Sequence, residues 1–563
     1  MPGHAIDAPP EAIPDETGGD EARLARRALV ALDLVFFLTM SALVMRAPCG
    51  AWENRAFGVP FWNNLDPGGP YVISSVHFFD PEFPPFRTGH PGTTLQFILW
   101  TAARIAHRVA TLWSPLPFVD FWARHIGWLH VLSSAVVAAL HVVSFHVLYA
   151  YARHIGLRAT TAVIAVLAYA TSFPVLYFGG RVSPEPLLVS LTLSALLLAG
   201  SSAQALGQAR LIRASGLAAG AGTASVLAIL SKLHLAYALP AVVLAQLLFQ
   251  RWDPRQARIE RVLRGLLPTA AFVAASIAMF VIGSLKVDWH AFFEFWLHYT
   301  PGNPVGRPDL PLAQLYWASL PSMARVVLFD AARNLSGHLR WTSNGIFTLS
   351  EGLFLLVGCT GLVRLWRRHP SARRDLVWPA ALCAGLLPVV AYRGSLHYYI
   401  LYMAFAALGF AHAVEAWLGP HPGRQAASEG SRFARWAVAT VLTHLLALVF
   451  FTATKLHDFA AFRSQVRPYL TALDRLPSGM RAAIVSRHFE FSLIDGGFPN
   501  YIDREHVGLT RLLEERARVV KRADLITPEL VDRFRIATVI DATSGAPRVI
   551  SIEKWLAAPP TNP

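Results

Sequence analysis

Long apolar runs separated by short polar breaks cover most of the chain between residues 28 and 451. Most of them approach about 20 residues, the length that an α-helix needs to cross a bilayer. The runs are Ala28–Met45, Val131–Tyr151, Thr160–Phe178, Pro186–Ala203, Leu217–Leu230, Leu233–Phe249, Leu266–Leu285, Phe347–Leu365, Leu376–Tyr392, Leu396–Trp417 and Trp436–Phe451. The pattern predicts an all-α polytopic membrane protein with roughly 11–13 transmembrane helices.

One stretch does not fit a simple alternation of crossings. Thr93–Trp113 is helical and apolar enough to span, but it contains Arg104, His107 and Arg108. If this stretch crosses the membrane as one span, every later loop falls on the side of the membrane opposite to the one that its arginines indicate. It is therefore either re-entrant, or Phe121–Tyr151 is more than a single crossing.

Composition supports the membrane class. The chain has 563 residues, of which 54% are hydrophobic and 15% charged, and its mean hydropathy is +0.40. A soluble protein carries about 25% charged residues. The cysteines Cys49, Cys359 and Cys383 show neither a disulfide framework nor metal-ligand spacing. The first apolar run lacks a small-residue cleavage site, so we expect it to stay as an anchor.

The formal net charge of +14 reflects topology rather than nucleic-acid binding. Basic residues gather in short breaks beside the apolar runs, which marks the cytoplasmic side of a membrane protein. The arginines in these breaks are Arg23, Arg26, Arg27, Arg153, Arg158, Arg210, Arg213, Arg251, Arg255, Arg258, Arg261, Arg264, Arg364, Arg367, Arg368, Arg373, Arg374, Arg424, Arg432 and Arg435.

This orientation predicts three parts. Residues 1–27 form a disordered cytoplasmic N-terminus, and residues 28–453 a multi-span membrane domain with extracytoplasmic loops 48–92 and 286–345. Residues 454–563 form a small extracytoplasmic α/β domain, with strand-like runs at 482–486 and 536–540 and a helical stretch at 510–521. The abundance of arginine and alanine favours a bacterial source, and hence the inner membrane with its active site on the extracytoplasmic face.

The loop after the first apolar run carries candidate chemistry. It contains Asp66, the pair Asp80 and Glu82, and His77 and His90 among prolines and aromatics. Loops held by a rigid scaffold often carry function, and a carboxylate at a membrane face can activate a hydroxyl group. The alternative is a solvated loop in which Asp and Pro only make turns.

Cationic residues at the lips of apolar runs fall on the same predicted face as this loop. Charged residues at such places are costly in lipid and mark function by default. They are found with polar neighbours at three positions: Arg181 with Glu185, Lys232, and Arg393 with His397 and Tyr398. Arginine and lysine clamp phosphates, so an anionic lipid headgroup is a fitting ligand. The alternatives are snorkelling to the interface or an ion pair such as Arg181–Glu185.

The order of these features resembles the C-type glycosyltransferase superfamily, particularly its protein O-mannosyltransferase and aminoarabinose-transferase branch. In that family the first loop carries an acidic pair followed by an aromatic, and later a His-Pro-Pro-Leu or Lys-Pro-Pro-Leu element that opens a helix. The corresponding residues here, over about Ala28 to Trp417, are Asp66 with Tyr71, His90-Pro91-Gly92-Thr93, Ala123-Arg124-His125-Ile126, Gly180–Pro186, Ser231-Lys232-Leu233-His234 and Arg393–Tyr399. The second acid of the pair is absent, and Pro-Gly-Thr replaces Pro-Pro-Leu.

The resemblance implies a multi-span enzyme that takes a sugar from a polyprenyl-phosphate donor and transfers it, with inversion, to an extracytoplasmic hydroxyl of a glycan, glycolipid or protein. It implies Asp66 as the base, with Asp80 and Glu82 as alternates or as ligands of a divalent metal. Apart from this possible metal, no cofactor is predicted, and no nucleotide-binding motif is present. The cations at the other positions, with His90, would hold the donor phosphate.

Two other classes stay open. A lipid or solute transporter or flippase without transferase activity would also place charges among its spans, but would tend to show internal repeats and broken helices at matching positions. A membrane scaffold without catalysis would not need charges gathered on one face.

Overall fold

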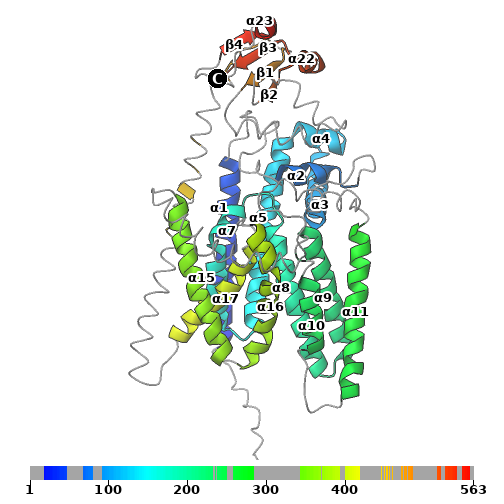
Figure 1. Ribbon diagram of the computed structural model, residues 1–563, viewed down its shortest axis with the longest axis vertical. Helices are drawn as coiled ribbons and strands as arrows, with labels where there is room; N and C mark the ends of the chain where they lie inside the picture. The colour runs from blue at the N-terminus through cyan, green and yellow to red at the C-terminus, as the bar shows by residue number, and fades with distance from the viewer. Residues whose placement is uncertain are drawn as a thin grey trace, which may run out of the picture.

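The helices of the protein run up and down along one axis, as the computed structural model shows (Figure 1). The structure describes residues 18–46, 68–79, 92–249 apart from 233–234 and 236–237, 258–284, 343–393 apart from 369, 400–418, scattered positions between 446 and 480, 481–485, 517–520, 526–541 and 548–557. We call the end of the bundle that lies nearer the C-terminal sheet the upper end, and the opposite end the lower end.

The bundle confirms the predicted all-α membrane architecture. Its helices are α1 (Gly18–Arg46), α5 (Ile126–His154), α6 (Ala159–Ala170), α7 (Phe173–Phe178), α8 (Glu185–Gly207), α9 (Leu211–Ser231), α10 (Leu239–Phe249), α11 (Arg258–Ser284), α15 (Ser343–Arg368), α16 (Pro370–Arg393) and α17 (Ile400–Leu418). Within the described residues, 5 helices are long and apolar enough to cross a membrane, namely those containing Glu21–Met45, Gly127–His154, Glu185–Gly207, Leu211–Ser231 and Gly265–Ser284. The chain is an integral membrane protein.

One predicted span is broken in the structure. The apolar run Thr160–Phe178 was expected to be continuous, but α6 ends at Ala170 and α7 begins at Phe173. Pro174 lies in the first turn of α7, and a proline inside a helix lacks the N–H group that would bond to the preceding turn. The chain therefore turns at Thr171-Ser172 before it continues.

Small residues let α15 and α17 approach closely. A Cβ atom added at Gly409 would collide with the carbonyl oxygen of Gly358, and one added at Gly361 would collide with the carbonyl oxygen of Gly409. In a bilayer, where lipid tails are as apolar as leucine, such close backbone packing is a main source of helix association. These glycines fix α15 against α17.

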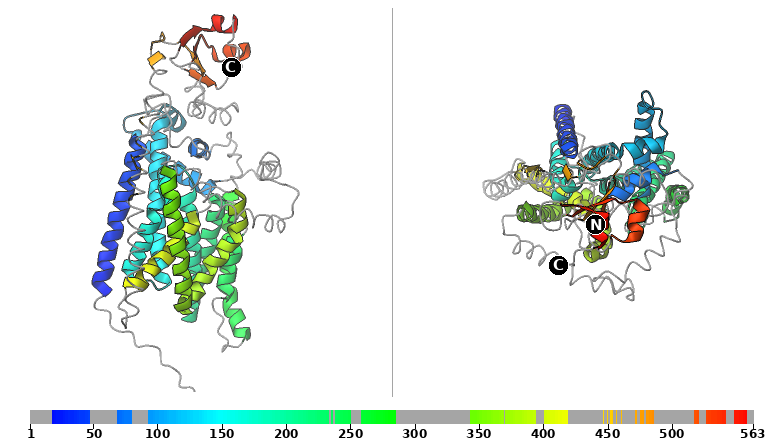
Figure 2. Two further views of the ribbon diagram at one scale, coloured as in Figure 1. Left: turned by 60° about the vertical axis from the view of Figure 1, so that its left-hand side comes forward. Right: turned by 90° about the horizontal axis from the view of Figure 1, so that it is seen from above.

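Three shorter helices gather at the upper end of the bundle, as both side views show (Figures 1 and 2). They are α2 (Gly68–Val76), α3 (Thr93–Ala110) and α4 (Phe118–Arg124). The first turn of α3 is tied to the end of α9, because Thr94 Oγ1 donates to the carbonyl oxygen of Leu227 at 2.9 Å. Its second half is held to α4, because Trp122 Nε1 donates to the carbonyl oxygen of Ala103 at 3.3 Å. Because α3 lies with α2 and α4 at the upper end (Figures 1 and 2), α3 does not cross, and α5 is a single crossing.

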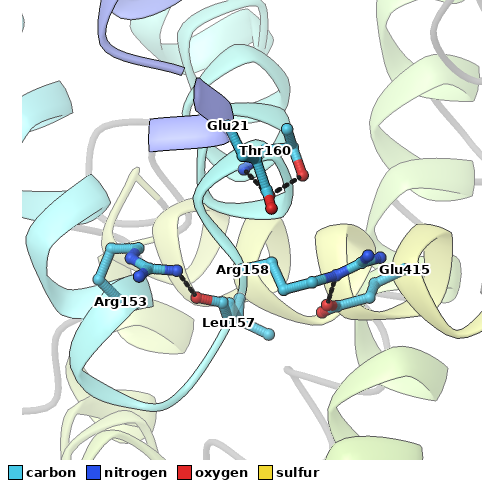
Figure 3. A network of polar contacts seen from close by, with 6 residues as sticks. All are labelled: Glu21, Arg153, Leu157, Arg158, Thr160 and Glu415. Carbon is cyan, nitrogen blue, oxygen red and sulfur yellow. Dashed lines mark hydrogen bonds and ion pairs between the residues drawn. The ribbon is translucent and has the colours of Figure 1, made fainter. Parts of the chain in front are cut away.

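The lower end is held by polar contacts between helices that are distant in sequence (Figure 3). Glu21 at the start of α1 accepts hydrogen bonds from the backbone N–H of Thr160 at 3.2 Å and from its hydroxyl at 2.8 Å. Arg158 forms an ion pair with Glu415 near the end of α17. Several arginines of the predicted cytoplasmic breaks also lie at the lower ends of their helices: Arg23, Arg26, Arg27, Arg153, Arg158, Arg210, Arg213, Arg364 and Arg367.

We therefore predict that the lower end is cytoplasmic. A cysteine introduced at Gly68, where α2 begins, should react with an impermeant thiol reagent in intact cells. One introduced at Gln208, in the turn between α8 and α9, should react only after lysis, because this turn lies at the opposite end of the bundle. Gel detection of the label in a background without native cysteines measures both, and the reverse pattern would contradict the orientation.

The C-terminal residues form a small α/β unit, as the sequence predicted. Its sheet has the strand order β2-β1-β3-β4, with β1 (Ala482–Val485) parallel to both β2 (Ala517–Val520) and β3 (Thr538–Asp541), and β4 (Arg548–Ser551) antiparallel to β3. The helices α22 (Pro528–Phe534) and α23 (Ile552–Ala557) accompany it.

The predicted helix at 510–521 is wrong over its described part. Residues 517–520 form β2, and Val519 and Val520 pair with Ile484 and Val485 of β1. Branched side chains such as valine fit a pleated, half-buried surface. Residues 517–520 form a strand and not a helix because they pair with β1, which is distant in sequence.

Candidate functional site

A carboxylate and an ammonium group meet at the upper end of the α8–α9 hairpin. Glu185 is the first residue of α8, between Pro184 and Pro186, and Lys232 directly follows the last residue of α9 in an extended conformation. A negative side chain is stabilised at a helix N-terminus and a positive one at a C-terminus. Because the two helices are antiparallel neighbours, both favourable positions fall at the same end of the hairpin.

The pair is buried and short. Lys232 Nζ donates to Glu185 Oε1 at 2.6 Å, and both residues are 3% exposed. Burial lowers the pKa of the Lys232 ammonium from its ordinary value, and the adjacent Glu185 carboxylate opposes this shift. Charges in such surroundings persist only when they are paired or hydrogen-bonded. The carboxylate therefore holds the lysine charged and fixed in place.

Arg181 lies in the turn before α8. The sequence suggested an ion pair between Arg181 and Glu185 as one alternative, but the contact that Arg181 makes is with Tyr177. Its guanidinium carbon is 3.6 Å from the centre of the Tyr177 ring, a cation–π contact. Burial lowers its pKa from the ordinary value, opposed by Tyr177. Glu185 forms its ion pair with Lys232, so Arg181 supplies a cation that is held by an aromatic ring.

The start of α3 joins this pair to the acidic loop. The helix that was predicted from Thr93 begins there, as α3. Gly92 precedes it with φ 51°, and a Cβ atom there would collide with the ring of Tyr71, which is fully buried in α2. A proline could not adopt this φ, whereas glycine adopts it without strain. Helix α2 packs on the start of α3. In the sequence, the candidate carboxylates Asp66 and Asp80 stand before and after α2.

We expect Gly92→Ala to destabilise the protein more than Gly156→Ala. Both glycines have positive φ, 51° and 93°, but Gly156 has no atom within 4 Å of its added Cβ. The left-handed conformation alone costs about 1–2 kcal/mol, and Gly92→Ala adds the collision with Tyr71. Thermal unfolding in detergent measures both variants. In a Tyr71→Ala background the excess cost of Gly92→Ala should vanish, and an unchanged excess would contradict this packing.

The sequence interpretation missed polar residues buried beside the pair. His141 in α5 and Tyr169 in α6 are fully buried and close enough to Glu185 to interact with its charge. The hydroxyl of the neighbouring Ser144 donates to the carbonyl oxygen of His141 at 2.6 Å. Both residues are visible in the sequence as polar side chains within apolar runs. The sequence alone does not show which of these polar side chains face Glu185.

The structure brings together part of the predicted site. Lys232 and Glu185 are paired, Arg181 lies in the turn that precedes Glu185, and Arg393 ends α16. The remaining predicted site residues lie outside the described residues: Asp66, Asp80, Glu82, His90, His397 and Tyr398. Within the described part of the chain, no group of three or more His, Cys, Asp or Glu side chains could hold a metal ion. The predicted metal ligands Asp80 and Glu82 therefore stay a prediction.

Among the solved structures that resemble this chain are the following two. The first is an oligosaccharyltransferase from Archaeoglobus fulgidus in its apo form, with 14% identity, a TM-score of 0.41, and coverage of 83% of this chain and 63% of that one. The chain thus spans less than two thirds of that protein. The second is ArnT from Cupriavidus metallidurans in the apo state, with 13% identity, a TM-score of 0.49, and coverage of 96% and 95%. No family model matches the chain, and no curated protein matches it.

The likeness is of structure only. With TM-scores below 0.5 and identities below 15%, neither the reactions nor the site residues of those proteins transfer to this chain.

Proposed function

We propose that this protein is a membrane glycosyltransferase. It would move a sugar from a polyprenyl-phosphate donor to a hydroxyl acceptor, a cell-envelope glycan, glycolipid or protein, on the extracytoplasmic face and with inversion. The observation that carries the proposal is the buried Glu185–Lys232 pair at the upper end of the bundle. Intramembrane charge pairs of this kind are costly to keep and mark substrate sites by default.

The charges near this pair suit a phosphate leaving group. Glu185 neutralises the charge of Lys232 and holds its ammonium group in place. Arg181 instead lies against the ring of Tyr177, which does not neutralise its charge. The donor phosphodiester carries one negative charge, and the released phosphate monoester carries up to two. Fixed cations aimed at charge that develops in the transition state lower the barrier, and Arg181 and Arg393 supply this charge in the proposal.

The reaction balances without a covalent intermediate. The acceptor oxygen attacks the anomeric carbon as the bond from that carbon to the phosphate oxygen breaks. The bonding electrons leave with the phosphate, and a carboxylate, Asp66 in the leading assignment, takes the proton of the acceptor hydroxyl. One displacement inverts the anomeric configuration.

The test is a transfer assay on the purified protein in proteoliposomes, with a donor labelled in its sugar and a cell-envelope extract as acceptor. Label moving from the lipid phase to the acceptor supports the proposal, and analysis of the anomeric linkage tests inversion. Arg393→Ala should raise the donor concentration needed for half-maximal rate, because a charge-assisted hydrogen bond is worth about 1.5–3 kcal/mol. Lys554→Ala in α23 is a matched control that should leave it unchanged.

A transporter is the second candidate, favoured by one observation. Helix α9 ends at Ser231 and Lys232 directly after it is extended, and broken helices often bind ions or substrates in transporters. In the same proteoliposomes, donor lipid that crosses the bilayer without loss of its sugar would favour transport. No transfer to any acceptor, together with such crossing, would overturn the glycosyltransferase proposal.

A further inference from the structure

Helix α3 is a membrane-surface element whose outer side has two distinct sectors. Its inner side packs on the protein through residues that are buried: Leu95, Gln96, Leu99, Ala103, His107 and Ala110. At about 100° per residue, Ile105, Val109 and Leu112, the last in the turn after the helix, fall on the outer side within a sector of about 60°. Leu112 is 81% exposed and Ile105 is 63% exposed. Apolar side chains so exposed, in one patch, mark a surface that has a partner.

The neighbouring sector of the same helix carries two arginines beside the exposed Phe97. Arg104 and Arg108 are one turn apart and exposed, and α3 contains no acidic residue. The guanidinium carbon of Arg104 is 3.9 Å from the centre of the Phe118 ring, so its charge is held beside the helix. The following helix α4 adds one acid, Asp120, and one arginine, Arg124, and the two helices together stay positive.

The course of α3 sets where these sectors lie. The helix lies at the upper end of the bundle (Figures 1 and 2), where Thr94 bonds to α9 and Ala103 to Trp122 of α4. Its 18 residues extend about 27 Å along the membrane boundary instead of through it. A helix with an apolar sector beside a basic one lies in the plane of the interface, with the apolar side in the acyl region and the cations at the headgroups.

We propose that α3 docks on the outer leaflet and that Arg104 and Arg108 select anionic phospholipid there. Charge complementarity fixes the occupant, since two exposed guanidinium groups beside an apolar sector match a phosphate headgroup above its acyl chains. A protein partner would match the apolar sector but would gain nothing from cations placed beside it at headgroup level. This proposal is independent of the proposed sugar transfer.

The test measures which lipid lies next to α3. A bimane label is placed at Leu112→Cys, with Cys49, Cys359 and Cys383 changed to serine, and the full chain is reconstituted in mixed phosphatidylcholine and phosphatidylglycerol vesicles. Brominated acyl chains are supplied in one lipid or the other, and quenching of the label reports contact with that lipid. We expect phosphatidylglycerol to quench the label more strongly than its share of the vesicle lipid predicts. The expected enrichment of phosphatidylglycerol next to the label is about two- to fivefold.

Two variants separate charge from folding. Arg104→Gln/Arg108→Gln should remove the enrichment and keep quenching by the bulk lipids, whereas Arg104→Lys/Arg108→Lys keeps the charge and should keep the enrichment. Arg108→Gln alone leaves the Arg104 contact with Phe118 intact and should lower the phosphatidylglycerol enrichment partly. Equal quenching by both lipids in the unaltered helix would overturn the selection of anionic lipid. No quenching by either lipid would overturn the docking itself.

Discussion

Asp66→Asn is expected to lower the rate of sugar transfer by about 10²–10⁴-fold, the usual contribution of a general base. Asparagine keeps the size and part of the hydrogen bonding of aspartate, but it cannot accept a proton at neutral pH. Donor binding should be preserved, because the proposed phosphate contacts come from Arg181 and Arg393. The transfer assay at saturating donor, together with a donor-binding measurement, separates the two effects.

Asp80→Asn is the matched control for this experiment. It makes the same chemical change in the same loop and should cost less, since Asp66 is the residue that the family resemblance matches to the base. A reversed ranking would assign the base to the Asp80–Glu82 pair. Full activity in both variants would leave the loop structural and would contradict the proposed mechanism.

Lys232→Ala is expected to lower the free energy of unfolding by about 3–5 kcal/mol, because it removes the ammonium partner of the buried Glu185 carboxylate. The pair is 2.6 Å long, and both side chains are 4% exposed. Unfolding in detergent, followed by circular dichroism, measures the loss. Lys232→Met/Glu185→Leu removes both charges at once and should be far less destabilising than either single change.

The Arg158–Glu415 pair at the lower end provides the comparison. The Arg158 side chain is 52% exposed, so Arg158→Ala should cost at most about 1 kcal/mol. If Lys232→Ala proved as mild as Arg158→Ala, the Lys232–Glu185 pair would not be a buried ion pair in the folded protein.

Periodicity predicted the helices well where a run of apolar residues was long and uninterrupted, as in α5, α8 and α9. It did not predict the break at Thr171-Ser172, because a proline in a first helical turn is compatible with either a helix start or a kink. The segment at 517–520 was mistaken for helix because its pairing partner, β1, is distant in sequence.

The candidate site shows the same limit. Glu185 and Lys232 were each singled out as charges at the lips of apolar runs, but not as partners, because they are 47 positions apart. Only the antiparallel course of α8 and α9 brings them together. His141 and Tyr169 were missed for a related reason, since a polar residue in an apolar run does not reveal which helix it faces.

The hairpin formed by α8 and α9 also bears on how the protein enters the membrane during synthesis. Charged residues in inserting segments cost free energy in lipid. Glu185 opens the first arm of the hairpin and Lys232 closes the second, so an insertion step that takes both arms together carries a neutral pair. We therefore expect the two arms to enter the membrane together as one unit of biogenesis.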